Sequence, residues 1–181
     1  VGWGFVDATG ARPFAGQGFH APTLEQVLTE LPDVRINIDI KEGTQDGTQR
    51  VVDMVRKHDS SHRVLLTSFY SRTRDQLIDM DYRGPTGLGK RDALALVFLP
   101  EFLLKGRFRD GDRAQLPPKF GPLNLGTSKF IDKAHRLGLK VDFWTINDQP
   151  TADELIRAGA DGIMSDCPEE LAPKLTPLLG M

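Results

Sequence analysis

The chain has 181 residues, which is enough for one domain with a sizeable hydrophobic core. Its composition is 39% hydrophobic and 27% charged with a net charge of −2, which excludes the basic balance of proteins that bind nucleic acid or anionic membranes through overall charge. No apolar run reaches the roughly 18 residues of a transmembrane helix, and the single cysteine, Cys167, excludes an internal disulfide. We therefore expect neither a nucleic-acid partner nor a membrane span.

The first predicted element is a helix that begins after Thr23. Thr23 and Gln26 have the spacing of a capping box, in which two side chains satisfy free N–H groups at a helix start. The apolar residues that follow recur at helical spacing and form one stripe: Leu24, Val27, Leu28 and Leu31. The pattern predicts an amphipathic helix that packs on a core.

The segment from Arg35 to Lys41 has the period-two alternation of a β-strand. Three isoleucines face one side, and the other side carries Asn37, Asp39 and Lys41. Burying that polar face costs free energy unless a metal, a phosphate or a partner satisfies it. In a barrel of parallel strands, such groups near the strand's carboxyl end form the active site. An exposed antiparallel strand with an ordinary Asp/Lys pair explains the alternation equally well.

Helices and strands alternate through the middle of the chain. Helical periodicity covers 46–57, 71–80, part of 92–104, and 128–137, where Gly138 ends the helix. Strand patterns cover 64–67 and 113–116, and 84–90 is a loop or a short strand. The polar segment 105–112 is predicted to be a surface loop.

Two short motifs are set aside as chance matches. Residues 84–90 fit the first seven positions of a phosphate-binding P-loop, but Arg91 stands where Ser or Thr must hold Mg²⁺. His58 and Asp59 lie at the end of a predicted helix, where a histidine is a common partner of the helix dipole. His20 and His135 lack metal-ligand spacing to another His or Cys.

The last third of the chain has a clear strand–helix–strand–helix order. A strand pattern at 140–147 precedes a helix for which Thr151 and Glu154 form a predicted capping box after Pro150. Gly159 ends that helix, 160–166 is the next strand, and Pro168 opens a last helix. This repeat is typical of a parallel sheet with covering helices.

With these elements the chain resembles the glycerophosphodiester phosphodiesterase family, a (β/α)₈-barrel group of metal-dependent phosphodiesterases. Four stretches carry the resemblance: 22–28, 36–41, 141–147 and 159–168. Weaker similarity lies at Ser68-Phe69 and at 115–117. The order and spacing of these stretches match the family from the first residue to nearly the last.

Three family motifs are not found in the required place: His-Arg-Gly, Glu-x-Asp, and the His-Asp that supplies a general acid. A complete barrel of this type typically needs about 250 residues. We therefore expect residues 1–181 to form a single domain, the C-terminal three-quarters of a TIM-type (β/α)₈ barrel. This incomplete α/β barrel would hold about the last six βα units and lack the first two strands.

The resemblance implies roles for individual residues. Asp39 aligns with a carboxylate ligand of the family's divalent cation, Ca²⁺ or Mg²⁺, although the family has Glu there and Asp reaches one methylene less far. Lys41 aligns with the catalytic lysine that faces the substrate phosphate. Trp144 aligns with the aromatic residue at the glycerol end of the pocket, and Asn147 is expected at the substrate-binding rim. Asp166 is a rim residue or a helix cap.

The expected reaction of the full-length enzyme is hydrolysis of a small-molecule glycerophosphodiester to glycerol 3-phosphate and an alcohol. The 181-residue chain is itself expected to be inactive. Two alternatives stay open: another barrel phosphodiesterase, of the phosphatidylinositol or sphingomyelin type, or a non-catalytic binding protein of the same fold. The expected compartment is the cytoplasm, with a signal peptide upstream of Val1 left open. The sequence does not determine the oligomeric state.

Overall fold

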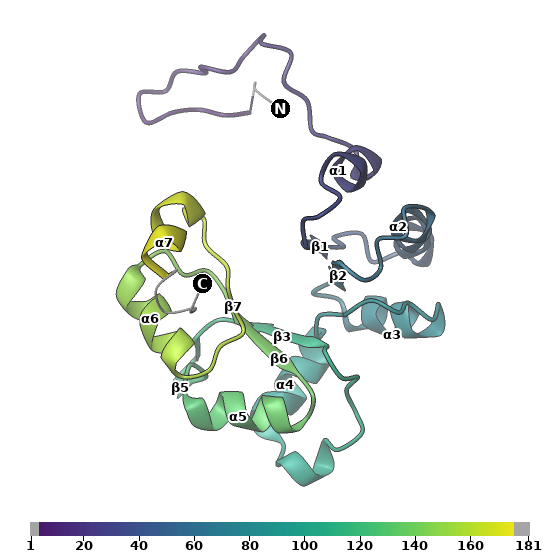
Figure 1. Cartoon of the computed structure of the whole chain (residues 1–181), viewed down its shortest axis with the longest axis vertical. Coiled ribbons are helices and arrows are strands. Elements are labelled where there is room, and N and C mark those ends of the chain that lie inside the picture. The colour runs from purple at the N-terminus through teal and green to yellow at the C-terminus, as the bar shows by residue number, and fades with distance from the viewer. Residues whose placement is uncertain (1–3, 176–181) are drawn as a thin grey trace.

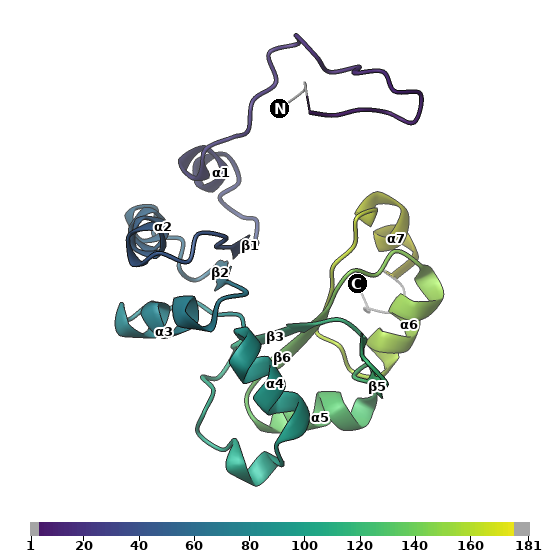
Figure 2. The ribbon, with the colours of Figure 1, turned by 180° about the vertical axis from the view of Figure 1, so that it is seen from behind.

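The computed structural model describes residues 4–175, so the predicted domain boundaries at 1 and 181 lie outside the described residues. Figures 1 and 2 show helices on the outer side of a curved set of strands, and an N-terminal arm that extends away from them. The arm leads into α1 (Leu24–Glu30). Within residues 4–175, no helix has the length and apolar content needed to cross a membrane.

Apart from one short hairpin, the strands are parallel and follow one another in chain order. β1 (Ile36–Asp39) pairs with β2 (Val64–Thr67), and β3 (Arg113–Leu116), β6 (Lys140–Phe143) and β7 (Gly162–Ile163) form a second sheet. Residues 86–87 connect the two sheets. Thr86 bridges to β2 and Gly87 bridges to β3, both in parallel.

Helices separate the parallel strands, which is the α/β arrangement that the sequence predicts. They are α2 (Gln45–Lys57), α3 (Ser71–Asp79), α4 (Lys90–Phe98), the 3₁₀ turn η1 (Glu101–Leu103), α5 (Ser128–Arg136), α6 (Gln149–Arg157) and α7 (Pro168–Leu175). A short antiparallel hairpin, β4 (Lys119–Phe120) and β5 (Leu123–Asn124), follows β3. The α/β class is confirmed, and the number of barrel strands that the chain contributes stays a prediction.

Two hydrophobic clusters fill the space between helices and strands. The first joins α1, α2 and α3 to β1 and β2, and its fully buried members include Val52, Val55 and Leu66. Tyr82 belongs to it and donates its hydroxyl to the Val64 carbonyl at 2.7 Å, and burial raises the pKa of Tyr82 to about 12. The second, larger cluster packs α4, α5, α6 and α7 against β3 and β6.

Most of the predicted helix signals are confirmed, with one correction. The Thr23 and Gln26 capping box is present, and Gly138 follows α5 in the left-handed region with a φ of 79°. The box predicted at Thr151 and Glu154 is wrong, because the N-cap of α6 lies three residues earlier. Asp148 is the N-cap, and its side chain accepts a hydrogen bond from the Thr151 N–H at 2.9 Å. Pro150 fits the first helical turn, since it has no N–H to satisfy.

The sequence predicts that 105–112 is a surface loop. In the structure this segment is partly buried. Asp112 is only 1% exposed, and it accepts hydrogen bonds from Arg74 of α3 at 2.8 Å and from the Thr86 N–H at 3.0 Å. Arg74 also forms an ion pair with the buried carboxylate of Asp92 at 3.3 Å. Arg107 forms a second ion pair with Asp92, at 2.6 Å. A polar segment is buried here because arginines from separate elements satisfy its carboxylates.

Candidate active site at the carboxyl ends of the strands

Asp39 and Lys41 lie together at the carboxyl end of β1. Asp39 is the last residue of the strand, and its Oδ2 accepts a hydrogen bond from Lys41 Nζ at 2.5 Å. The side chains are 41% and 82% exposed, so water reaches both charges. The alternation is as predicted, because Ile36, Ile38 and Ile40 are more buried than their polar neighbours. The pair presents one ammonium and one carboxylate at the strand's end.

Trp144 is expected on the same side of the strands as Asp39, on the alternation of side chains along a strand. Asn37 of β1 and Asp142 of β6 line one hollow of about 480 Å³. Asp39 and Trp144 each lie two residues further on and do not line this hollow, and alternation predicts that they project to the same side as Asn37 and Asp142. Trp144 follows β6 directly, donates its N–H to the Leu116 carbonyl at 3.1 Å, and is 43% exposed.

An ion pair lies on this face beneath the strand ends, and sequence reasoning missed it. Arg113 of β3 donates through Nε and Nη2 to the two oxygens of Asp142 on β6, at 2.5 Å each. The carboxylate raises the pKa of Arg113. Gly162 of β7 lies against the pair, since a Cβ there would come 2.4 Å from Asp142 Oδ1. The available signal was the carboxylate of Asp142 between the apolar residues Val141 and Phe143.

Asn147 and Asp166 form a separate hydrogen-bonded unit. The Asn147 amide donates to Asp166 Oδ2 at 3.3 Å, and its Oδ1 accepts from the Asp166 N–H at 2.9 Å. Ser165 also donates its hydroxyl to Asn147 Oδ1 at 3.1 Å. The unit connects the loops that follow β6 and β7. Within residues 4–175, no hydrogen bond or ion pair joins it to Asp39 or Lys41.

The residues present do not make a metal site by themselves. Within the described part of the chain, no group of three or more His, Cys, Asp or Glu is placed to hold a metal ion. Hard divalent cations take six or more oxygen ligands, several of them carboxylates. Asp39 is a single carboxylate whose Oδ2 already contacts an ammonium. Its role as a metal ligand stays a prediction.

The weaker signals in the sequence have structural explanations. Ser68 is buried and donates its hydroxyl to the Ile40 carbonyl at 2.7 Å, which fastens the end of β1 to the end of β2. His58 closes α2, with its Nε2 3.4 Å from Glu25 Oε1. Lys90 of the P-loop-like segment begins α4 and lies over the ring of Phe69 at 5.7 Å.

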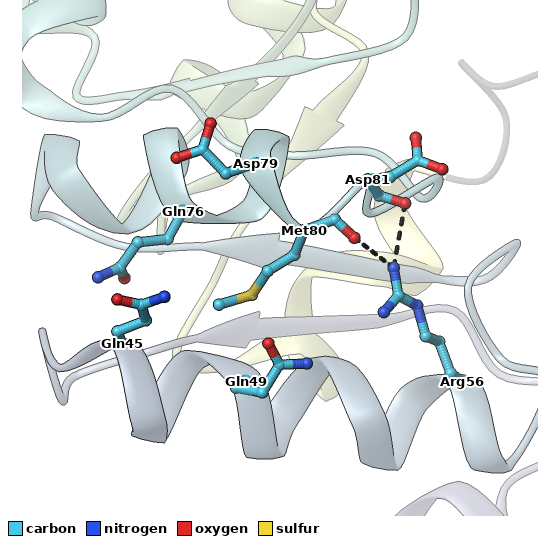
Figure 3. A pocket seen from close by; sticks show the side chains of 7 residues that line it. All are labelled: Gln45, Gln49, Arg56, Gln76, Asp79, Met80 and Asp81. Carbon is cyan, nitrogen blue, oxygen red and sulfur yellow. Dashed lines mark hydrogen bonds between the residues drawn. The ribbon is translucent and has the colours of Figure 1, made fainter.

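A second hollow lies between α2 and α3. Figure 3 shows its lining, which includes the side chains of Gln45, Gln49 and Gln76. Arg56 donates to the carbonyls of Met80 and Asp81 at one end of it. This hollow, also of about 480 Å³, lies on the helical side of the sheet and contains none of the predicted site residues.

Comparison with known sequences gives a family and a relative. The pattern of the glycerophosphoryl diester phosphodiesterase family matches residues 6–170. A protein of Mycobacterium tuberculosis (strain ATCC 25618 / H37Rv), named probable glycerophosphodiester phosphodiesterase 2, is 31% identical over 157 residues. The match covers 83% of this chain and 58% of the relative, so the chain spans less than two thirds of that protein's length.

Solved structures with the same fold include two from this group of enzymes. A glycerophosphoryl diester phosphodiesterase domain from Mycobacterium tuberculosis has a TM-score of 0.70 at 15% identity, over 91% of this chain and 68% of that one. A glycerophosphodiester phosphodiesterase from Parabacteroides distasonis has a TM-score of 0.62 at 22% identity, over 87% of this chain and 65% of that one. At these identities the similarity establishes the fold, which in this family is a TIM-barrel-like α/β architecture.

Proposed function

This chain belongs to the glycerophosphoryl diester phosphodiesterase family, and from that premise we propose that the whole protein hydrolyses glycerophosphodiesters to glycerol 3-phosphate and an alcohol. The observation that carries the proposal is the Asp39–Lys41 pair at the carboxyl end of β1, within the family match over residues 6–170. In parallel barrels, this end of the strands supplies the catalytic groups.

Lys41 is proposed to bind the phosphate. A phosphodiester is anionic and resists attack by an oxygen nucleophile, so catalysis requires neutralisation of its charge. The Lys41 ammonium is 82% exposed, which leaves it free to donate to a non-bridging oxygen while Asp39 holds it from one side. Trp144 is proposed to lie on the same face as Lys41 and to pack against the glycerol end of the substrate, and Asn147 to contribute to the rim.

Enzymes of the family generally depend on a divalent cation. When bound, such an ion supplies positive charge at the phosphate. Asp39 supplies one carboxylate, and the residues from 4 to 175 form no complete ligand set with it. We therefore propose that the 181-residue chain alone binds the product or substrate phosphate weakly and does not turn substrate over.

The test is isothermal titration calorimetry of the 181-residue chain with glycerol 3-phosphate. Lys41→Ala should weaken binding by about tenfold or more, because a hydrogen bond to a charged group contributes about 1.5–3 kcal/mol. The matched control is Lys140→Ala, which removes an exposed lysine at the opposite end of a parallel strand and should leave binding unchanged.

Three outcomes would contradict parts of the proposal. Equal binding by Lys41→Ala and the unsubstituted chain would remove the phosphate role of Lys41. Tighter binding of inositol phosphate than of glycerol 3-phosphate would favour a phosphatidylinositol-type enzyme. Turnover of glycerophosphocholine by the 181-residue chain, lost in Lys41→Ala, would show that the chain contains a sufficient site.

A further inference from the structure

Six large apolar side chains gather on the outer surface around the end of α4, and we call them the α4-end patch. They come from α4, η1 and the β4–β5 hairpin, with exposed fractions from 39% to 70%: Phe98, Leu99, Phe102, Leu103, Phe120 and Leu123. Isolated exposed apolar residues are common, but a contiguous group marks an interaction surface. We propose that this patch docks on the surface of an anionic phospholipid bilayer.

The patch is held on a fixed base. The rings of Phe98 and Phe120 pack edge to face with centroids 6.2 Å apart, which joins the hairpin to the end of α4. Lys133 of α5 donates to the carbonyls of Leu96 and Leu99 at 2.6 and 2.7 Å, so the last turn of α4 is tied to its neighbour. Figures 1 and 2 show α4 and α5 together on the outer side of β3 and β6.

η1 keeps the apolar side chains pointing outward. The residue that follows it, Leu104, is only 1% exposed and anchors the turn in the second hydrophobic cluster. Phe102 and Leu103, the two residues before it, are exposed to solvent by 70% and 59%. Such residues dock by inserting into the boundary between lipid headgroups and acyl chains.

The charges around the patch favour an anionic surface. Lys105 follows η1 and Lys119 begins the hairpin, and both are exposed without an ion pair among residues 4–175. The acidic residue within the patch, Glu101, is neutralised by Arg136 at 2.9 Å. Lysines beside an anionic leaflet contribute about 1 kcal/mol each. The whole chain has a net charge of −2, so attraction to lipid must come from this local arrangement.

The test is flotation of the 181-residue chain with vesicles made of equal parts of phosphatidylglycerol and phosphatidylcholine. Phe102→Ser should lower the vesicle-bound fraction about tenfold, because insertion of the ring into the apolar layer is lost. Lys105→Glu should lower binding to these vesicles while leaving the weaker binding to pure phosphatidylcholine unchanged. High salt should act like Lys105→Glu.

The matched control is Phe69→Ser. Phe69 is 69% exposed, nearly the same as Phe102, but it contacts Lys90 at the other end of α4, about 13 Å away along the helix. This variant should bind vesicles as the unsubstituted chain does. Equal loss in both variants would show non-specific adsorption and overturn the proposal, as would full binding by Phe102→Ser.

A second copy of the chain is the other occupant to be tested. Light scattering without vesicles measures the mass of the unsubstituted chain and of Phe102→Ser. If Phe102→Ser lowers that mass and the unsubstituted chain does not float with vesicles, the patch is a contact between copies and the lipid proposal is wrong. If the mass is the same for both and only vesicle binding differs, the proposal stands.

Discussion

Single residues with similar chemistry contribute to this protein in different ways, and burial decides which. The Asp39–Lys41 pair is short at 2.5 Å, yet its side chains are 41% and 82% exposed. Exposed pairs contribute about 1 kcal/mol or less to stability, because water screens them and two side chains lose rotamer freedom. The pair is therefore better understood as a site for a ligand than as a support of the fold.

Asp112 is the opposite case, and its removal should destabilise the chain strongly. It is 1% exposed and holds Arg74, which is 6% exposed, together with the backbone N–H of Thr86. Removing one partner of a buried charge pair costs about 3–5 kcal/mol, since the other charge stays buried. We expect Asp112→Ala to lower the free energy of unfolding by about that amount in urea titrations.

The control for this prediction lies two residues away. Asp110 is exposed, and replacing it by Ala should change the free energy of unfolding by about 0.5 kcal/mol or less. A cost for Asp112→Ala no larger than that of Asp110→Ala would show that the buried network contributes nothing to stability.

At the scale of elements, α6 gives a test of which residue caps a helix. The hydrogen bond from the Thr151 N–H, the largest of several influences, lowers the pKa of Asp148 from its ordinary value of 3.8. A carboxyl with a lowered pKa stabilises the fold above its ordinary pKa, and that contribution is lost as the pH falls through the folded value. Asp148→Ala should therefore lower the melting temperature at pH 7, and the difference should shrink as the pH falls below about 3.8.

The control variant for the cap is Glu154→Ala. Glu154 is the acidic residue of the capping box that the sequence suggests, but in the structure it is exposed and lies within α6. It should leave the melting temperature nearly unchanged. The melting temperatures are measured by circular dichroism. A larger decrease for Glu154→Ala than for Asp148→Ala would show that Thr151 and Glu154 form the cap and that Asp148 does not.

At the scale of the whole molecule, the open edges of the sheet predict self-association. Within residues 4–175, β1 pairs only with β2, and β7 pairs only with β6. Unpaired N–H and C=O groups on such edges template pairing with another chain. We expect light scattering to find a mass above that of the monomer, rising with concentration. A stable monomer at high concentration with cooperative unfolding would contradict this prediction.

A proline at one position of β1 tests the edge directly. Ile36 and Ile40 donate their N–H groups toward β2, to Arg63 and Thr67, so the N–H of Asn37 points to the open edge. Asn37→Pro removes an edge donor without breaking the ladder to β2, and it should lower the mass in light scattering. Ile38→Pro removes a donor on the paired side and should instead lower the melting temperature.

The sequence by itself determined the local elements and the order in which they repeat. Alternation at 36–41, the Thr23 capping box and the glycines after α5 and α6 depend on neighbours within a few residues, so their pattern is readable without a fold. The family resemblance added the residue roles of Asp39, Lys41 and Trp144, which remain predictions. The strand at 64–67 was predicted with its observed ends, because both are set by a local run of apolar residues.

Only the tertiary structure decided which polar groups are buried and how they are satisfied. Asp112 looks like a surface carboxylate in the sequence, and nothing near Asp112 or Asp142 reveals their partners, since Arg74 and Arg113 are 38 and 29 residues away. Burial of apolar faces produces a periodic pattern in the sequence, so the fold class could be predicted. Pairing of charges far apart in the chain produces no such pattern, so the ionic network could not be predicted.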